Sequence, residues 1–187
     1  MPGFDPSMPS IPLPCECVLR RAGGTLAQQR AALSGLIAES GWTHPTKEDS
    51  GRPRMGPLHC SLSHGGGWVA AARGPKPVGI DVEGATDRLV HVRRRFVGEA
   101  DQPVIDHFGD DLNTLCRLWT AKEAVFKAFG TEVDFLTGIR WNEVQADGAH
   151  LTALRQQQPM TLRWTALDSN GTPVWLAIAV ADSEQWA

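Results

Sequence analysis

The sequence lacks long hydrophobic runs, and no stretch approaches the roughly 20 consecutive apolar residues that a membrane-spanning helix requires. The chain does not open with a basic segment followed by an apolar core, so we expect no secretory signal. With 187 residues and a hydrophobic content of 42%, it can bury one substantial core or two small ones. We therefore expect a soluble cytoplasmic protein without a membrane partner.

The sequence also has few cysteines at the spacing of metal ligands and no excess of basic charge. The four cysteines, Cys15, Cys17, Cys60 and Cys116, include one C-x-C pair and no second pair at the spacing of metal ligands. This pattern favours reduced thiols over a zinc site or a disulfide framework. A formal net charge of −3 is unlike the strongly basic balance of nucleic-acid-binding proteins. We expect no nucleic-acid partner, and any basic patch should be local.

Proline and glycine divide the first part of the chain. The first 14 residues contain five prolines, and we interpret residues 1–14 as a flexible tail. Apolar residues recur at helical spacing over residues 25–39, which predicts a helix. Residues 44–57 are rich in proline, glycine and charge, so they predict a loop, and this loop contains Arg52.

A serine-histidine pair then precedes three glycines. Ser63-His64 is followed by Gly65-Gly66-Gly67 and an apolar strand pattern that reaches residue 72. Glycine permits dihedral angles that other residues avoid, and successive backbone N–H groups in such a turn can bind an anion. The same glycine run is also typical of a flexible hairpin. Both interpretations stay open from the residues alone.

The remainder of the chain shows helical patterns followed by strand patterns. Two segments are predicted helices, residues 87–96 and 110–129. Three later segments are predicted strands, residues 139–144, 160–167 and 174–180, separated by turn signals at 147–148 and 169–171. They indicate an antiparallel meander. Because strands and helices do not alternate regularly, we predict an α+β fold with two linked halves, residues 15–75 and 76–187.

Three carboxylates lie on two segments that a fold could bring together. If residues 79–83 are extended, Asp81 and Glu83 point to one side while the intervening apolar residues point to the other. Glu123 lies on the predicted helix over residues 110–129, whose other residues are mainly apolar. Two or three carboxylate oxygens, completed by water and phosphate, are a common way to bind Mg²⁺.

Ordinary structural interpretations of the same residues also stay open. An acidic pair on a strand is usually a solvated feature at the rim of a sheet. Glu123 and Lys127 have the spacing and order of an exposed helical ion pair worth about 0.3 kcal/mol. Arg88, His91 and Arg95 share one face of the first predicted helix in this region, and a solvated surface would explain them equally well.

Taken together, the motifs resemble a known family. Gly79-Ile80-Asp81-Val82-Glu83 is followed about 35 residues later by Trp119-x-x-Lys122-Glu123-Ala124-x-x-Lys127. This pair of motifs is similar to the signature of the 4'-phosphopantetheinyl transferases, in their larger pseudo-dimeric, surfactin-synthetase-activating type. The resemblance extends to Ser61-Leu62-Ser63-His64 and to Gly51-Arg52-Pro53, where the family has Gly-Lys-Pro.

The resemblance implies a holo-[acyl-carrier-protein] synthase. Such an enzyme transfers the 4'-phosphopantetheine arm of coenzyme A to a serine of an apo acyl or peptidyl carrier protein and releases 3',5'-ADP. It also implies two pseudo-twofold-related halves, each a helix packed on a small antiparallel sheet, with the ligand cleft between them. Two halves in one chain make a monomer sufficient.

The resemblance also implies roles for individual residues. Asp81, Glu83 and Glu123 would bind Mg²⁺, or Mn²⁺ in its place, and Glu123 would accept the serine proton directly or through water. Glu123 and Lys127 are the implied catalytic residues. The implied coenzyme A contacts are Arg52, Ser63, His64, Asp81, Lys122 and Lys127. Carrier proteins are generally acidic around the modified serine, so the expected docking residues are Arg88, His91 and Arg95.

Two features depart from the family pattern. Gly65 stands where members often have a second serine, so one hydroxyl contact to phosphate would be either absent or replaced by a backbone N–H. Only 60 residues precede Ser61, so the first half is short, and the groups that bind the 3'-phosphate stay open among Arg20, Arg21 and Arg30.

Two other function classes stay open. One is a different Mg²⁺-dependent phosphoryl-transfer or hydrolytic enzyme, and the other is a non-catalytic binder of coenzyme A or a nucleotide. The sequence also leaves open whether the carrier protein serves fatty-acid, polyketide or nonribosomal peptide biosynthesis.

Overall fold

The computed structural model describes residues 13–48, 51–130, 133–167 and 171–182. The first half of this described part contains β1 (Glu16–Arg21), α1 (Leu26–Glu39), β2 (Thr46–Lys47), β3 (Pro53–Met55), β4 (Leu58–Gly65) and β5 (Trp68–Gly74). The second half contains β6 (Val78–Gly84), α2 (Arg88–Val92), η1 (Arg93–Arg95), η2 (Glu99–Asp101), α3 (Gln102–Phe108), α4 (Leu112–Phe129), β7 (Ile139–Gln145), β8 (Gly148–Ala153), β9 (Gln158–Leu167) and β10 (Val174–Ala181), where η denotes a 3-10 helix.

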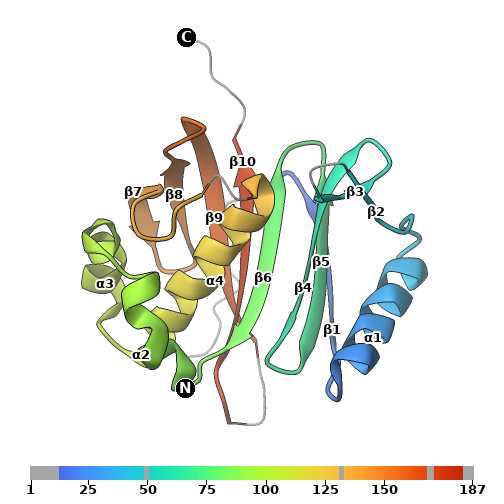
Figure 1. Cartoon of the computed structure of the whole chain (residues 1–187), viewed down its shortest axis with the longest axis horizontal. Helices are drawn as coiled ribbons and strands as arrows, with labels where there is room; N and C mark the ends of the chain where they lie inside the picture. The colour runs from blue at the N-terminus through green and yellow to red at the C-terminus, as the bar shows by residue number, and fades with distance from the viewer. Residues whose placement is uncertain (1–12, 49–50, 131–132, 168–170, 183–187) are drawn as a thin grey trace.

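Each half forms one five-stranded antiparallel sheet. The strand orders are β1-β5-β4-β3-β2 in the first sheet and β6-β10-β9-β8-β7 in the second. Figure 1 shows α1 outside the first sheet and α4 against the second, with β6 beside β4 and β5 in the middle. The predicted α+β class and its organisation in two halves, each with a helix on an antiparallel sheet, are therefore confirmed.

Helix α1 begins at a reciprocal N-cap. The Thr25 hydroxyl accepts a hydrogen bond from the Gln28 N–H, and the Gln28 side-chain oxygen accepts one from the Thr25 N–H at 2.7 Å. The helix buries Leu33, Leu36 and Ile37 in a cluster with apolar residues of β4 and β5. The predicted helix over residues 25–39 is confirmed.

Helix α4 extends for 18 residues and confirms the predicted helix over residues 110–129. The Asp111 carboxylate caps its first turn by accepting a hydrogen bond from the Thr114 N–H at 2.8 Å. Gly130 ends the helix with φ 80°, a conformation that favours glycine. In the described part of the chain, no helix is long and apolar enough to cross a membrane.

A separate apolar cluster lies between the two sheets. It is formed by alternate residues of the facing strands: Ala70 and Ala72 of β5, Val78, Ile80 and Val82 of β6, and Val174, Leu176 and Val180 of β10. The cluster explains why the halves pack together, because each strand presents one apolar face to the other sheet. The opposite faces pack against α1 in the first half and α4 in the second.

The predicted meander in the second half is confirmed, and the structure has one more strand in it than was predicted. Strands β7, β9 and β10 match the three predicted strands, and Asp147-Gly148 lies at the turn between β7 and β8. Strand β8 was not predicted, because its short apolar run starts directly at that turn. The turn signal at residues 169–171 falls partly outside the described residues, as do residues 1–12 of the predicted tail.

Two local predictions were wrong. Residues 44–57 are not a continuous loop, since β2 and β3 lie there and pair with each other, and β3 also pairs with β4. This pairing is long-range, so local composition did not reveal it. Residues 87–96 do not form one helix, because α2 ends at Val92 and continues as the 3-10 helix η1. Strand β1 and helix α3 were also not predicted.

The backbone of α4 lies directly on β6 at Gly79. A Cβ atom at Gly79 would lie 1.7 Å from the Ala124 carbonyl oxygen and 2.9 Å from the Ala128 nitrogen. Only glycine allows two backbones to approach so closely at a position that faces a helix. This contact sets the distance between the acids of β6 and the charged residues of α4.

We predict that Gly79→Ala lowers the free energy of unfolding by about 3 kcal/mol, because the new methyl group must push α4 away from β6. The matched control is Gly35→Ala in α1, where the nearest atom to an added Cβ is the flexible Glu39 side chain at 3.8 Å. The control should increase stability by about 0.5–1 kcal/mol. Urea denaturation of both variants measures the difference, and equal effects would contradict the close contact.

Candidate active site

The two predicted acids of β6 and its core residues lie on opposite faces of the strand. Ile80 and Val82 are buried in the cluster between the sheets, whereas Asp81 and Glu83 lie on the face next to α4. Alternation along an extended strand produces this division. Asp81 is 7% exposed and Glu83 is partly buried, so both carboxylates need polar or charged partners.

Two serine hydroxyls join β4 to the edge of β6. Ser61 Oγ accepts a hydrogen bond from the Ile80 N–H at 3.0 Å, and Ser63 Oγ accepts one from the Val82 N–H at 3.1 Å. Ser63 Oγ also donates to Asp81 Oδ1 at 2.8 Å. The side chains thus satisfy N–H groups that a neighbouring strand would otherwise have paired.

Gly65 lets the end of β4 approach β6 closely, as Gly79 does for α4. A Cβ atom at this residue would lie 2.2 Å from the Val82 carbonyl oxygen. The following turn residues Gly66 and Gly67 have φ values of 55° and 79° and join β4 to β5. The glycine run is therefore the turn of a β-hairpin that packs against β6.

Lys127 connects α4 to strands β4 and β6. Its ammonium group donates to Asp81 Oδ1 at 2.6 Å, to Ser63 Oγ at 3.1 Å and to the Ile80 carbonyl oxygen at 3.2 Å. The Lys127 side chain keeps 27% exposure, so its charge lies at the boundary between protein and solvent. Lys127 therefore forms an ion pair with Asp81 across two elements, whereas the ordinary alternative was an exposed pair with Glu123 along the helix.

The remaining acids carry negative charge that is only partly compensated. Burial raises the pKa of Glu123 above that of a free glutamate, and the Asp81 and Glu83 carboxylates raise it further while Lys127 opposes them. Burial also raises the pKa of Glu83, with Asp81 adding to the effect and the Gly84 N–H opposing it. Such shifts mark a site where a bound cation would be favourable.

The donor atoms fit Mg²⁺ in their chemistry. Asp81, Glu83 and Glu123 supply hard carboxylate oxygens, which Mg²⁺ prefers. In the residues that the structure describes, no three His, Cys, Asp or Glu side chains are already arranged as a metal-binding group. The electrostatic coupling among the three acids thus supports a cation site, with Asp81 bonded to Lys127 in this structure.

Other predicted residues lie apart from this cluster. Lys122 is on a different face of α4, 1% exposed, and its ammonium forms a buried ion pair with Asp101. Burial lowers the pKa of Lys122, and Asp101 opposes this effect. The expected contact of Lys122 with phosphate is therefore incompatible with its position, because its N–H donors are already used inside the protein.

The two remaining coenzyme A candidates belong to the first half. Arg52 lies between the halves and donates from Nη1 to the Ala128 carbonyl oxygen at 3.2 Å, near the C-terminus of α4. His64 is exposed and directly follows Ser63 in β4. Strand alternation places His64 on the opposite side of β4 from Ser63. Of the candidates for binding a 3'-phosphate, Arg20 forms an ion pair with Glu39.

The predicted docking residues form an exposed basic surface. Arg88, His91 and Arg95 lie on α2 and η1 and are all exposed, and His91 Nδ1 lies 2.8 Å from the Asp87 carbonyl oxygen. The neighbouring Arg93 pairs instead with Asp110 at 2.8 Å.

Sequence reasoning missed several residues of the cluster. Ser61 repeats the role of Ser63 two residues earlier, and its alternation with Ser63 was the available signal. Gly79, two residues before Asp81, allows the close approach of α4. Cys116 donates from Sγ to the Glu83 carbonyl oxygen at 3.4 Å, and no sequence signal distinguished it.

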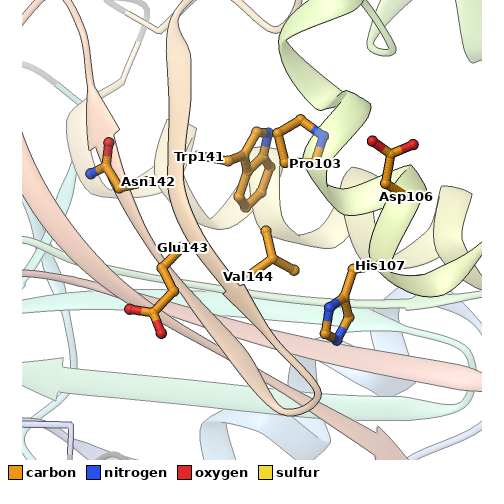
Figure 2. Close-up of a pocket in the computed structure, with 7 residues that line it drawn as sticks. All are labelled: Pro103, Asp106, His107, Trp141, Asn142, Glu143 and Val144. Carbon is orange, nitrogen blue, oxygen red and sulfur yellow. The ribbon is translucent and has the colours of Figure 1, made fainter.

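A pocket of about 450 Å³ lies elsewhere, between α3 and β7. Figure 2 shows its lining, which consists of Pro103, Asp106, His107, Trp141, Asn142, Glu143 and Val144. None of these lining residues belongs to the cluster around Asp81.

The fold consists of two β-sheet halves, and three acids and a lysine lie close to where they meet. Comparison with known proteins identifies the family to which the chain belongs. A family model described as the 4'-phosphopantetheinyl transferase superfamily matches residues 77–179, more than half of the chain. The chain therefore belongs to the 4'-phosphopantetheinyl transferase superfamily. The matched region includes β6 and α4, and so the acids and Lys127.

Two curated relatives are named as 4'-phosphopantetheinyl transferases. A 4'-phosphopantetheinyl transferase of Bacillus subtilis is 29% identical over 80 residues, which cover 42% of this chain and 36% of the relative. The 4'-phosphopantetheinyl transferase gsp of Aneurinibacillus migulanus is 24% identical over 119 residues, which cover 62% of this chain and 50% of the relative. The chain thus spans half or less of the length of these curated relatives.

We predict that Glu123→Gln raises the Tm by roughly 2 °C at pH 7.5 in the presence of EDTA. The raised pKa means that folding favours protonated Glu123, so the ionised side chain destabilises the protein above that pKa. The difference in Tm should vanish as the pH falls below the folded-state pKa toward 4.5, because both side chains are then neutral. Scanning calorimetry across this range measures it.

Exposed Glu99 provides the control, and Glu99→Gln should leave the Tm nearly unchanged at both pH values. A lower Tm for Glu123→Gln at pH 7.5 would show that Glu123 makes a favourable ionic interaction instead of being repelled by Asp81 and Glu83.

Proposed function

We propose that this protein transfers the 4'-phosphopantetheine arm of coenzyme A to a serine of an apo carrier protein and releases 3',5'-ADP. The observation that carries the proposal is the convergence of Asp81, Glu83, Glu123 and Lys127 where β6 meets α4, within the region matched by the superfamily. In this proposal the acids bind a cation and one of them also acts as a base, while the neighbouring ammonium group contacts phosphate.

Asp81, Glu83 and Glu123 would hold Mg²⁺, or Mn²⁺ in its place. When bound, the metal ion neutralises negative charge on the pyrophosphate of coenzyme A. The raised pKa values of Glu83 and Glu123 support this assignment, because a cation would stabilise carboxylates whose ionised forms are disfavoured by burial and by the neighbouring acids.

Glu123 acts in this proposal as the general base. Its carboxylate accepts the proton of the carrier serine, directly or through water, as the serine oxygen forms a bond to the pantetheine-linked phosphorus. The P–O bond to the other phosphate breaks, and 3',5'-ADP leaves with the bonding electron pair. A raised pKa brings Glu123 closer to the operating pH, where a general base is most effective.

Lys127 stabilises the negative charge that develops on the transferring and departing phosphates. Its ammonium group is partly exposed and is held by Ser63 and Asp81 in the orientation that a phosphate would meet. Phosphoryl transfer depends mainly on positioning and charge neutralisation, so a fixed ammonium group at this point contributes directly.

Arg52, Ser63 and His64 complete the proposed coenzyme A contacts. Arg52 supports binding between the halves, because it already bridges from the first half to the end of α4. Its planar guanidinium can contact phosphate with two N–H groups. Ser63 is shared with Asp81 and Lys127, and His64 is exposed beside it. The proposal describes a cytoplasmic enzyme that functions as a monomer.

Incubation with coenzyme A, Mg²⁺ and a panel of apo carrier proteins tests the function. We predict that mass spectrometry detects the added arm and that EDTA stops the reaction. Glu123→Gln should lower kcat by about 10²–10⁴-fold without recovery at high Mg²⁺, since its amide accepts no proton. Asp81→Asn should also lower the activity, because a metal ligand is weakened, but added Mg²⁺ should restore part of it.

The matched control is Glu99→Gln, which should retain full activity. Hydrolysis of coenzyme A without transfer would favour another phosphoryl-transfer enzyme, and binding without turnover would favour a coenzyme A binder. Unchanged transfer in EDTA would exclude the metal assignment.

The exposed basic surface of Arg88, His91 and Arg95 is the proposed docking site for an acidic carrier. We predict that Arg88→Glu combined with Arg95→Glu raises the KM for the carrier at least about tenfold and weakens its dependence on NaCl. The KM for coenzyme A should change much less, because of the two residues only Arg88 acts on the cluster, through its charge at Glu83. Steady-state kinetics at several salt concentrations measure both values.

Arg155 lies in the turn between β8 and β9, so Arg155→Glu controls for the change in net charge. If the control and the double variant change the carrier KM equally, the surface at α2 and η1 has no special role in docking.

A further inference from the structure

A second charged cluster lies inside the second half, on a face of α4 away from β6. Lys122 and Asp101 are 1% and 0% exposed, and the Lys122 ammonium lies 2.7 Å from each of the two Asp101 carboxylate oxygens. The same ammonium donates to the Phe135 carbonyl oxygen at 2.5 Å. No solvent-facing chemistry uses this pair, so its burial requires another explanation.

Asp101 connects Lys122 to two further elements. Its Oδ1 accepts a hydrogen bond from Trp141 Nε1 at 3.0 Å, and its Oδ2 accepts one from the Gly98 N–H at 2.8 Å. The network therefore joins α4 to η2, to β7 and to the segment at Phe135. Each buried charge has its partners, which is the condition under which a buried ion pair is tolerated.

Aromatic contacts surround this network on the same face of α4. Trp119 packs edge-on against Phe96 at 5.2 Å and Phe135 at 5.9 Å, and Phe126 packs against Phe135 at 5.8 Å. Trp119, Lys122 and Phe126 follow one another at helical spacings of three and four residues. Apolar contacts alone tolerate small rotations of a helix, whereas an ammonium between fixed oxygens does not.

We propose that Lys122 is a positioning residue that fixes the rotation of α4 about its axis. It thereby holds its neighbour Glu123, and Lys127 beyond it, toward Asp81 and Ser63. The inference rests on the proposed function, because it explains how the catalytic side chains are oriented. The backbone contact at Gly79 sets the distance of α4 from β6, and the Lys122 ion pair sets its angle.

The test compares Lys122→Met with the double variant Lys122→Met/Asp101→Asn. The single variant leaves a buried, unpaired carboxylate and should lower the Tm strongly. The double variant removes both charges, while the amide oxygen introduced at position 101 can still accept from Trp141 or Gly98, so its Tm should recover most of the loss. Arg155→Met is the control in the turn between β8 and β9 and should match the parent protein.

In the folded double variant we expect kcat to fall about 10²-fold, the usual effect of misplacing catalytic groups by about 1 Å. The Kd for coenzyme A, measured by calorimetry, should stay within about threefold of the parent value. The rise in Tm on adding Mg²⁺ should also become smaller, because Glu123 would turn away from Asp81. This last readout does not depend on activity.

Two outcomes would overturn the inference. If the double variant regains parental kcat together with its Tm, Lys122 serves stability alone. If the Kd for coenzyme A weakens by tenfold or more, Lys122 binds the ligand directly. A parent protein without transfer activity would instead contradict the proposed function, and the Mg²⁺ response of the variants would still test the positioning role.

Discussion

The close contact between α4 and β6 is the constraint on which the rest of the site depends. Because residue 79 has no side chain, the helix backbone lies on the strand and carries Lys127 within 2.6 Å of Asp81. Burial raises the pKa of Glu123, and the same contact brings it close enough for Asp81 and Glu83 to raise the pKa further. Three acids and a lysine, drawn from two distant segments of the sequence, thereby become one electrostatic unit.

The two lysines of α4, Lys122 and Lys127, differ in burial and in the compensation of nearby charge. Lys122 is fully buried with matched partners and stabilises one arrangement of the helix, whereas Lys127 remains partly exposed beside acids that lack full compensation. Burial and, to a smaller extent, repulsion between the acids raise the pKa of Glu83 and Glu123, and such shifts are frequent at functional sites. In our proposal the buried pair fixes the orientation of the helix that carries Glu123 and Lys127.

The first half contributes to the site mainly through side chains of β4 and through Arg52. Ser61 and Ser63 replace a missing strand partner at the edge of β6, and Arg52 reaches the end of α4. These links make the junction between the halves polar at the edge, while the cluster around Ile80 keeps it apolar between the sheets. The junction is thus firm enough to orient Ser63 and still open to solvent at Lys127.

The sequence by itself determined the α+β class, α1, α4 and most of the meander, because these depend on local periodicity and on strong stop signals such as Gly130. It also singled out the acids and Lys127, through the resemblance of their two motifs to the signature of a known family. Tertiary structure alone decided that residues 44–57 contain paired strands and that Lys122 faces Asp101. Both outcomes depend on distant residues, because hydrogen bonds between strands and the partner of a buried charge are supplied by other parts of the chain.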